Sequence, residues 1–152
     1  MKRLLLIVLP LLLIVGCSKP INHDSLIDRN GVKYQQDSQK PYSGKTFSLW
    51  DNGQKKFEGS YKNGELNGLE TKWYKNGQKK FEGTYKNGKQ VGKWTTWYSI
   101  GQKWSEVTYK NGKEDGLWTT WYDNGQKFFE GTYKDGELIS EKEWNEDGSV
   151  KE

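Results

Sequence analysis

The stretch ETKWYKNGQKKFEGTYKNG, from Glu70 to Gly88, recurs along the chain in modified copies that begin 24 residues apart. Two sets of residues keep this step throughout, namely Gly53, Gly77, Gly101 and Gly125, and Tyr61, Tyr85, Tyr109 and Tyr133. A fixed period of this kind is the signature of a repeat protein, in which each unit packs against its neighbours. We therefore predict four clear repeats within residues 46–139. A degenerate unit at 30–45 precedes them, and a C-terminal cap at 140–152 follows.

Two turn signals in each repeat predict two antiparallel strands. Asn76-Gly77 separates the runs TKWYK and QKKFEGTYK, and Asn87-Gly88 follows 11 residues later. Asn-Gly between such runs is the strongest short-range signal for a β-hairpin, because both residues tolerate the positive φ of a type I′ turn. The predicted fold is all-β, an elongated antiparallel meander of stacked β-hairpins. Its structural turns contain Gly53, Gly77, Gly101 and Gly125.

The length of the turns sets the register between strands. If both turns contain two residues, the first pairs Trp73 with Lys80 and the second pairs Phe81 with Trp94. Both registers place the same set of residues on one face, as the period-two alternation of a strand requires. This set is Phe81, Gly83, Tyr85, Trp94 and Tyr98. The glycine leaves bare backbone on which neighbouring rings can lie, so we expect this face to be the core.

The chain begins with a segment that resembles a targeting signal. Lys2 and Arg3 precede an apolar run from Leu4 to Val15, which is interrupted only by Pro10. A bilayer requires about 20 apolar residues in a spanning helix, so this run is too short to cross one. Its length and flanks are those of a secretory signal peptide. The run ends next to Cys17, the only cysteine of the chain, which has no partner for an internal disulfide.

The end of the leader, Ile14-Val15-Gly16-Cys17, resembles the bacterial lipobox. In that family the cysteine thiol receives a diacylglyceryl group and becomes the first residue after cleavage. The resemblance implies a lipoprotein signal peptide at 1–16, lipidation at Cys17 and a polar linker at 17–29, before a repeat domain at 30–152. Two or three acyl chains anchor a protein stably without crossing the membrane. We expect export across the inner membrane, and anchoring in the outer membrane of a Gram-negative cell or otherwise in the cell membrane.

Charge and composition argue against several functions. Removal of Lys2 and Arg3 with the leader would lower the formal net charge from +4 to +2, and lysine and glutamate alternate along the repeats. Without a basic block, we predict no nucleic-acid partner. His23, the only histidine, lies in the predicted linker, and the chain contains no Cys/His cluster, phosphate loop or nucleophile elbow. We therefore predict no catalytic residues, no metal and no cofactor, and thus a protein that is not an enzyme.

The repeat resembles the MORN family (membrane occupation and recognition nexus), and in particular its bacterial variant with Tyr-x-x-Asn-Gly and Tyr-Lys-Asn-Gly signatures. The matching residues are Tyr74 to Gly77 after Trp73, and Tyr85 to Gly88, with their 24-residue copies. The resemblance extends over residues 30–148 and implies an elongated, single-layered β-sheet. Members of the family act as scaffolds in protein interaction or lipid association. We therefore expect a membrane-anchored lipoprotein whose repeats form a non-catalytic scaffold for a protein partner in the cell envelope.

Two other functions remain open at this stage. Secreted hairpin arrays rich in tryptophan and tyrosine, such as choline- or glucan-binding repeats, are similar in composition, so the chain is alternatively a carbohydrate- or peptidoglycan-binding module. Some bacterial MORN variants are described as antitoxins of toxin–antitoxin pairs. That resemblance makes an antitoxin or an envelope immunity protein the second alternative.

A candidate partner site lies where the repeat pattern changes. Trp104 and Phe128 of the third and fourth repeats stand where the first two repeats carry lysine. On the face opposite the predicted core, two-residue turns would place Trp104 across from Trp97 and Phe128 across from Trp121. Exposed clusters of large rings mark interaction sites, and tryptophan is enriched among binding hot spots. We predict that these four rings bind the partner. The alternative is that a curled sheet or the C-terminal cap covers them as core.

Replacing Cys17 with alanine should release the protein from the membrane or leave the leader uncleaved, because no other segment is apolar enough to hold it. Membrane fractionation in high salt, with the processed size read from a gel, checks this prediction. A variant that stays with the membrane at its processed size would contradict the lipobox hypothesis.

Overall fold

The structure is a computed structural model that describes residues 19–152, so the leader and Cys17 lie outside the described residues. The described chain consists of β-strands and one short 3₁₀-helix. In chain order these are β1 (Ile21–Asn22), η1 (His23–Ser25), β2 (Leu26–Arg29), β3 (Val32–Gln35), β4 (Gly44–Leu49), β5 (Lys55–Lys62), β6 (Glu65–Leu66), β7 (Gly68–Trp73), β8 (Lys79–Lys86), β9 (Lys89–Trp97), β10 (Lys103–Lys110), β11 (Lys113–Trp121), β12 (Lys127–Lys134) and β13 (Glu137–Glu143).

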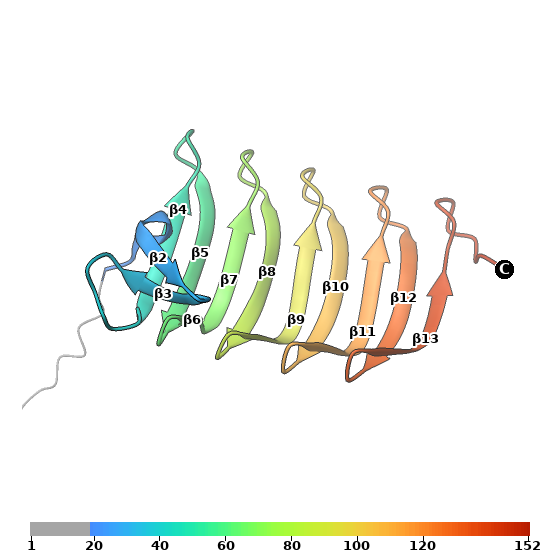
Figure 1. Ribbon diagram of the computed structural model, residues 1–152. Coiled ribbons are helices and arrows are strands. Elements are labelled where there is room, and N and C mark those ends of the chain that lie inside the picture. The colour runs from blue at the N-terminus through green and yellow to red at the C-terminus, as the bar shows by residue number, and fades with distance from the viewer. Residues whose placement is uncertain (1–18) are drawn as a thin grey trace, which may run out of the picture.

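One long sheet contains all the repeats. Its strand order is β1-β4-β5-β7-β8-β9-β10-β11-β12-β13, with β6 paired to β5. From β4 onward the strands follow one another in sequence order and pair antiparallel, and they lie in a single row in Figure 1. This arrangement confirms the predicted meander of stacked hairpins. The sheet is nevertheless mixed, because β1 pairs with β4 in parallel, which the sequence analysis did not predict.

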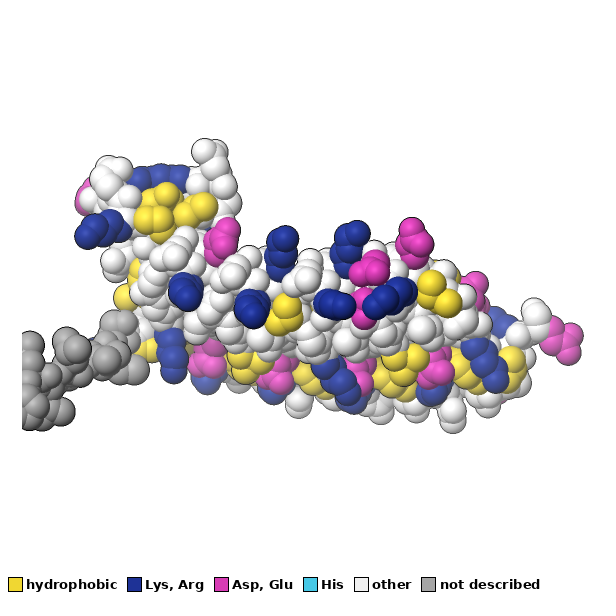
Figure 2. Space-filling model, turned by 90° about the horizontal axis from the view of Figure 1, so that it is seen from below, with side chains coloured by type: hydrophobic (Ala, Val, Ile, Leu, Met, Phe, Trp, Pro, Cys, Tyr) yellow, Lys and Arg dark blue, Asp and Glu magenta, His cyan; other side chains and the backbone are white. Residues whose placement is uncertain are grey.

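The segment predicted as a polar linker is part of the fold from Ile21 onward. It contributes β1, η1 and β2, and β2 pairs with β3 in a separate two-stranded sheet. Ile21 and Leu26 pack against the buried cluster of Tyr42, Phe57 and Tyr61. Two apolar side chains in a polar stretch thus anchor the segment. In Figure 2 this N-terminal block stands on one side of an otherwise thin slab.

The turns at the lower edge of the sheet in Figure 1 have the predicted type I′ conformation. At the lower turn between β8 and β9, φ is +50° at Asn87 and +71° at Gly88, and Lys86 pairs with Lys89. The equivalent pairs also have positive φ at both residues, namely Asn63-Gly64, Asn111-Gly112 and Asp135-Gly136.

The turns at the upper edge differ from the prediction. Of the Asn76-Gly77 pair only the glycine has positive φ, at +85°, and Trp73 pairs with Lys79 instead of Lys80. The Gly77 N–H donates to the Tyr74 carbonyl at 3.0 Å, which closes a turn of the three-residue class with a glycine bulge. Asn76 Oδ1 accepts the Gln78 N–H at 3.1 Å, and this local bond holds the asparagine inside the turn. The prediction of a two-residue turn at Gly77 was therefore wrong.

The predicted pairing of Phe81 with Trp94 was also wrong, although the face was right. A bulge displaces the register between β8 and β9, so that Phe81 pairs with Thr96. A shift of two residues leaves each side chain on its original face. The rings of Phe81 and Trp94 remain stacked at 5.6 Å between centroids, and Trp94 lies directly over Gly83. Tyr98, predicted for the same face, lies instead in an upper turn beyond the end of β9.

One face of the sheet, which we call the aromatic face, carries rings in successive repeats. Within a group, rings of neighbouring strands touch, as Tyr85 with Trp94 at 4.9 Å and Trp118 with Tyr133 at 5.4 Å between centroids. The members are Phe57, Tyr61, Phe81, Tyr85, Trp94, Tyr109, Trp118, Phe129 and Tyr133. These lateral contacts form the core, because β2 and β3 cover only the N-terminal end of the sheet (Figure 1).

Hydrogen bonds between neighbouring turns hold the repeats in alignment. In the upper turns a ring donates to a backbone carbonyl of the next repeat at 2.8–3.1 Å. The donors are Trp50, Tyr74, Tyr98 and Tyr122, and the acceptors are Trp73, Trp97, Trp121 and Trp144. In the lower turns a glycine N–H donates to the preceding repeat, as Gly88 does to Leu66 at 2.9 Å. Both edges of the sheet are therefore joined from one repeat to the next.

Replacing Gly125 with valine should lower the free energy of unfolding by about 1–3 kcal/mol, because a β-branched residue is strained at positive φ. The φ of Gly125 is +87°, and an added Cβ would meet no atom within 4 Å, so the loss would come from the backbone alone. Asp123→Val in the same turn, where φ is not positive, is the matched control. Urea unfolding measures both variants, and equal losses would contradict the assigned turn.

Candidate functional site

The four rings predicted to bind a partner do not form one cluster. Because the upper turns contain three residues, Trp97 pairs with Lys103 and Trp121 pairs with Lys127. The predicted pairings with Trp104 and Phe128 were therefore wrong. The extra turn residue moves these two rings away from the tryptophans, so that the four rings separate into two different environments.

Trp97 and Trp121 lie on the face opposite the aromatic face, which we call the charged face. Here a lysine lies over the tryptophan ring of the following hairpin and also pairs with a glutamate three residues further on. Lys79, for example, lies 5.7 Å from the Trp97 ring centroid and 2.6 Å from the Glu82 carboxylate. The lysines are Lys55, Lys79, Lys103 and Lys127, the rings Trp73, Trp97, Trp121 and Trp144, and the carboxylates Glu58, Glu82, Glu106 and Glu130.

This ladder gives the charged face a regular pattern over its whole length. Figure 2 shows the slab from its lower edge, and along the side opposite the N-terminal block basic, acidic and hydrophobic side chains alternate. The Glu106 carboxylate forms two ion pairs, with the Lys93 ammonium 2.8 Å from its Oε1 and the Lys103 ammonium 2.9 Å from its Oε2. Burial alone would raise the pKa of Glu106, but these two lysines lower it below its usual value. Exposed pairs of this kind each contribute only about 0–1 kcal/mol, so the ladder chiefly shields the tryptophan rings.

Trp104 and Phe128 belong to a separate row beside the upper turns. At the equivalent positions of the first two repeats, Lys56 lies over the Trp50 ring at 5.2 Å and Lys80 over the Tyr74 ring at 5.6 Å. Phe128 contacts the Tyr122 ring in the same way, with 5.2 Å between centroids. The exposed fractions are 49% for Trp104 and 38% for Phe128, and the Lys151 ammonium of the C-terminal segment lies 5.0 Å from the Phe128 ring centroid. Both rings are partly exposed, and their role in binding a partner stays a prediction.

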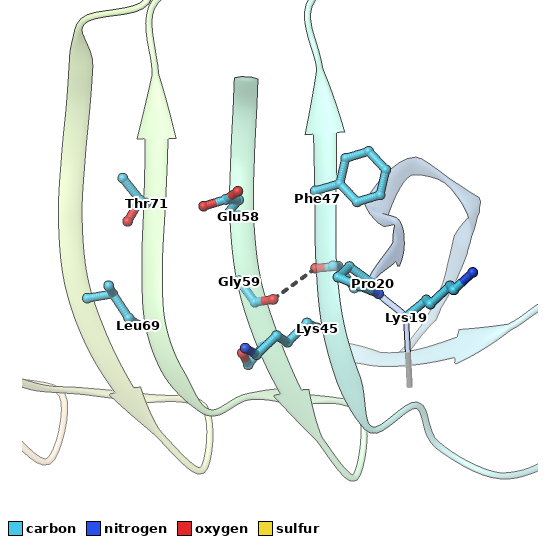
Figure 3. Close-up of a pocket in the computed structure, with 10 residues that line it drawn as sticks. Lys19, Pro20, Lys45, Phe47, Glu58, Gly59, Leu69 and Thr71 are labelled. Atoms are coloured by element: carbon cyan, nitrogen blue, oxygen red, sulfur yellow. Dashed lines mark hydrogen bonds between the residues drawn. The ribbon is translucent and has the colours of Figure 1, made fainter. Parts of the chain in front are cut away.

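A shallow groove on the charged face lies where the described chain begins. Lys19 and Pro20 form one wall, and Phe47, Glu58 and Leu69 stand on the strands β4, β5 and β7 beside it (Figure 3). Its volume is about 650 Å³. Lys19 is two residues from the predicted lipidation site, so the groove lies beside the point at which an anchor would leave the fold.

Within residues 19–152, no group of three or more His, Cys, Asp or Glu residues is placed to hold a metal ion. The same residues include no helix of the length and apolarity that crossing a membrane requires. The absence of an enzymatic activity stays a prediction.

Sequence reasoning missed the lysine–tryptophan–glutamate ladder and the bonds between upper turns. Both leave a signal in the sequence, since Lys79, Glu82 and Trp97 all have copies at the 24-residue step. The recurrence alone does not state which residues touch. The contacts link residues that are 17–18 or 22–23 positions apart, as Lys79 with Trp97 and Tyr74 with Trp97, and they depend on the turn length that was wrongly predicted.

Comparison with known families assigns the repeats. A family model described as a MORN repeat variant matches residues 42–63, 66–87, 90–111 and 114–135, which together make up more than half of the chain. Each matched segment contains one hairpin with its upper turn and ends at a lower turn. A search of curated proteins finds no match to this chain.

Proposed function

The chain belongs to the MORN repeat variant family, and from this premise we propose that it is a lipid-anchored bacterial scaffold that binds a protein partner in the cell envelope without catalysing a reaction. Repeats of this family often serve as binding or scaffold modules. The proposal joins this general role to the lipobox-like sequence at Cys17 and to the exposed rings of the third and fourth repeats.

The observation that carries the proposal is the exposure of Trp104 and Phe128. The fold does not require a ring at these positions, because lysine occupies them in the first two repeats and packs over the neighbouring ring there. Trp104 is 49% and Phe128 38% exposed, and exposed rings that stability does not require support a role in an interaction surface. Tryptophan is also among the residues enriched in the hot spots of protein interfaces.

The position of the rings favours a protein partner over a lipid surface. The described chain begins at the β4 end of the array, and β10 and β12, which carry Trp104 and Phe128, lie toward the other end (Figure 1). An anchor at Cys17 would therefore hold the membrane at one end of the sheet and leave these rings distant from it. An antitoxin or immunity protein would be one form of the same scaffold, with a toxin as the partner.

The double substitution Trp104→Lys with Phe128→Lys should abolish partner binding and leave the melting temperature unchanged. Lysine at both sites is expected to pack over Tyr98 and Tyr122 as Lys56 and Lys80 pack over Trp50 and Tyr74. The measurement is capture of envelope proteins by the wild-type and variant chains, together with thermal unfolding of each.

The matched control is Leu117→Lys on the charged face. Leu117 is 49% exposed, and Lys93 occupies the equivalent position of the preceding repeat, so this variant removes an exposed apolar side chain elsewhere. The Leu117→Lys variant should capture the same partner as the wild-type chain. Retention of the partner by the double variant, or a large loss of stability in it, would contradict the proposal.

A further inference from the structure

The aromatic face contains a hollow of about 420 Å³ beside Glu70, lined by residues of η1, β5 and β7. Glu70 stands at the position that Trp94 and Trp118 occupy in the third and fourth repeats, and that Thr46 occupies in the first. The Trp94 ring lies over the bare backbone of Gly83, whereas the equivalent Gly59 is covered by the Phe57 ring and Leu66. The second repeat therefore places a carboxylate, rather than a ring, at this point of the aromatic face.

The polar atoms inside the hollow are not satisfied. Glu70 is only 3% exposed, and its Oε1 lies 3.3 Å from the Lys72 ammonium. Within residues 19–152, neither Glu70 Oε2 nor the buried Nδ1 of His23 has a partner at full hydrogen-bond geometry, although the Tyr85 hydroxyl lies beside the Glu70 carboxylate. Both residues line the same hollow, one from β7 and the other from η1. Buried polar atoms without partners are uncommon in folded proteins, and two in one hollow indicate that a bound molecule supplies them.

The surroundings of these atoms define what such a molecule must carry. Lys33, Lys56 and Lys72 line the hollow together with the carboxylates of Asp24 and Glu70. Lys33 is paired with Asp28 at 3.2 Å and Lys72 with Glu70 at 3.3 Å. Lys56, whose ammonium lies 5.2 Å from the Trp50 ring centroid, forms no ion pair among the described residues and is the ammonium group that an anion could approach.

The walls of the hollow are aromatic. The rings of Phe57, Tyr61 and Tyr85 line it, and the His23 ring lies 4.4 Å from the Phe57 centroid. Burial, and next the charge of Lys33, lower the pKa of His23, so its imidazole is neutral near pH 7. A neutral imidazole nitrogen can accept a hydrogen bond from a hydroxyl or donate one to it.

We propose that this hollow binds an acidic sugar, with its carboxylate toward Lys56, its hydroxyls bonded to Glu70 and His23, and a C–H face against the aromatic wall. A simple anion would leave Glu70 Oε2 without a donor, and a cation would meet the Lys56 ammonium. An apolar ligand would leave both polar atoms unpaired. Hydroxyl groups that donate and accept, one carboxylate and an apolar ring face satisfy every feature together. This site is distinct from Trp104 and Phe128 and does not depend on a protein partner.

The test is a titration of the full chain with methyl glucuronide, followed through the imidazole NMR signals of His23, the only histidine. We expect a saturable shift, with weaker binding of methyl glucoside, which lacks the carboxylate, and none of acetate. No saturable shift, or equal binding of acetate, would overturn the proposal.

Variants locate the site. Glu70→Trp introduces the residue of the third and fourth repeats and should fill the hollow. It should weaken glucuronide binding about tenfold or more, which is the effect of losing a hydrogen bond to a charged group.

Lys56→Gln should reduce the affinity for glucuronide to the affinity for glucoside. This variant provides the test if Glu70→Trp does not fold. The control Leu69→Lys alters the opposite face of the same strand, matches Lys45 and Lys93, and should bind as the wild type does. Unchanged binding by Lys56→Gln, or by a folded Glu70→Trp, would overturn the assigned position.

Discussion

A single-layered sheet has no second layer against which to bury a face, so its side chains must bury one another along the sheet. Only the N-terminal end is covered, by β2 and β3, and the remaining repeats stand as a slab with solvent on both sides (Figure 2). The large aromatic content follows from this constraint, because rings are wide enough to reach across to the next strand, as Trp94 reaches Phe81, Tyr85 and Tyr109. On the charged face, the aliphatic stems of lysines cover the tryptophan rings, as Lys79 covers Trp97.

The same constraint separates positions that stability requires from positions that are free to vary. Trp94 and Gly83 fit together closely, whereas in the next repeat Val107 takes the place of the glycine and pairs with Trp118. The position of Lys80 accepts either lysine or a ring, since Phe128 occupies it in the fourth repeat. The position of Trp94 also holds Thr46 and Glu70, and at Glu70 a hollow and an unpaired carboxylate oxygen occur. The two proposed binding sites lie at these departures from the repeat, where the array differs from one unit to the next.

The sequence predicted the architecture because period and alternation are properties of neighbouring residues. The 24-residue step, the faces of the strands and the lower turns at Asn87-Gly88 were all predicted correctly. The upper turn was not, because Asn-Gly suits both two- and three-residue loops, and the bond of Asn76 to the Ser99 carbonyl links residues 23 positions apart. Because the turn length was wrong, the predicted cluster of Trp104 and Phe128 with the tryptophans was wrong as well. The hollow could not be predicted for another reason. Glu70 differs from its counterparts in the sequence, but His23 lay in a segment that was interpreted as a linker.

Packing of rings over bare backbone is tested most directly by Gly83→Ala. Gly83 has no positive φ, so alanine should be neutral or stabilising by about 0.5–1 kcal/mol if backbone entropy alone mattered. An added Cβ would instead lie 2.1 Å from the Trp94 ring, so we expect a loss of stability in urea unfolding. In a chain that already carries Trp94→Thr, adding Gly83→Ala should cause no further loss of stability, since threonine, which occupies the equivalent position at Thr46, leaves room for the methyl group. A Gly83→Ala variant as stable as the wild type would contradict the account. So would an equal effect of Gly83→Ala in the wild-type and Trp94→Thr backgrounds.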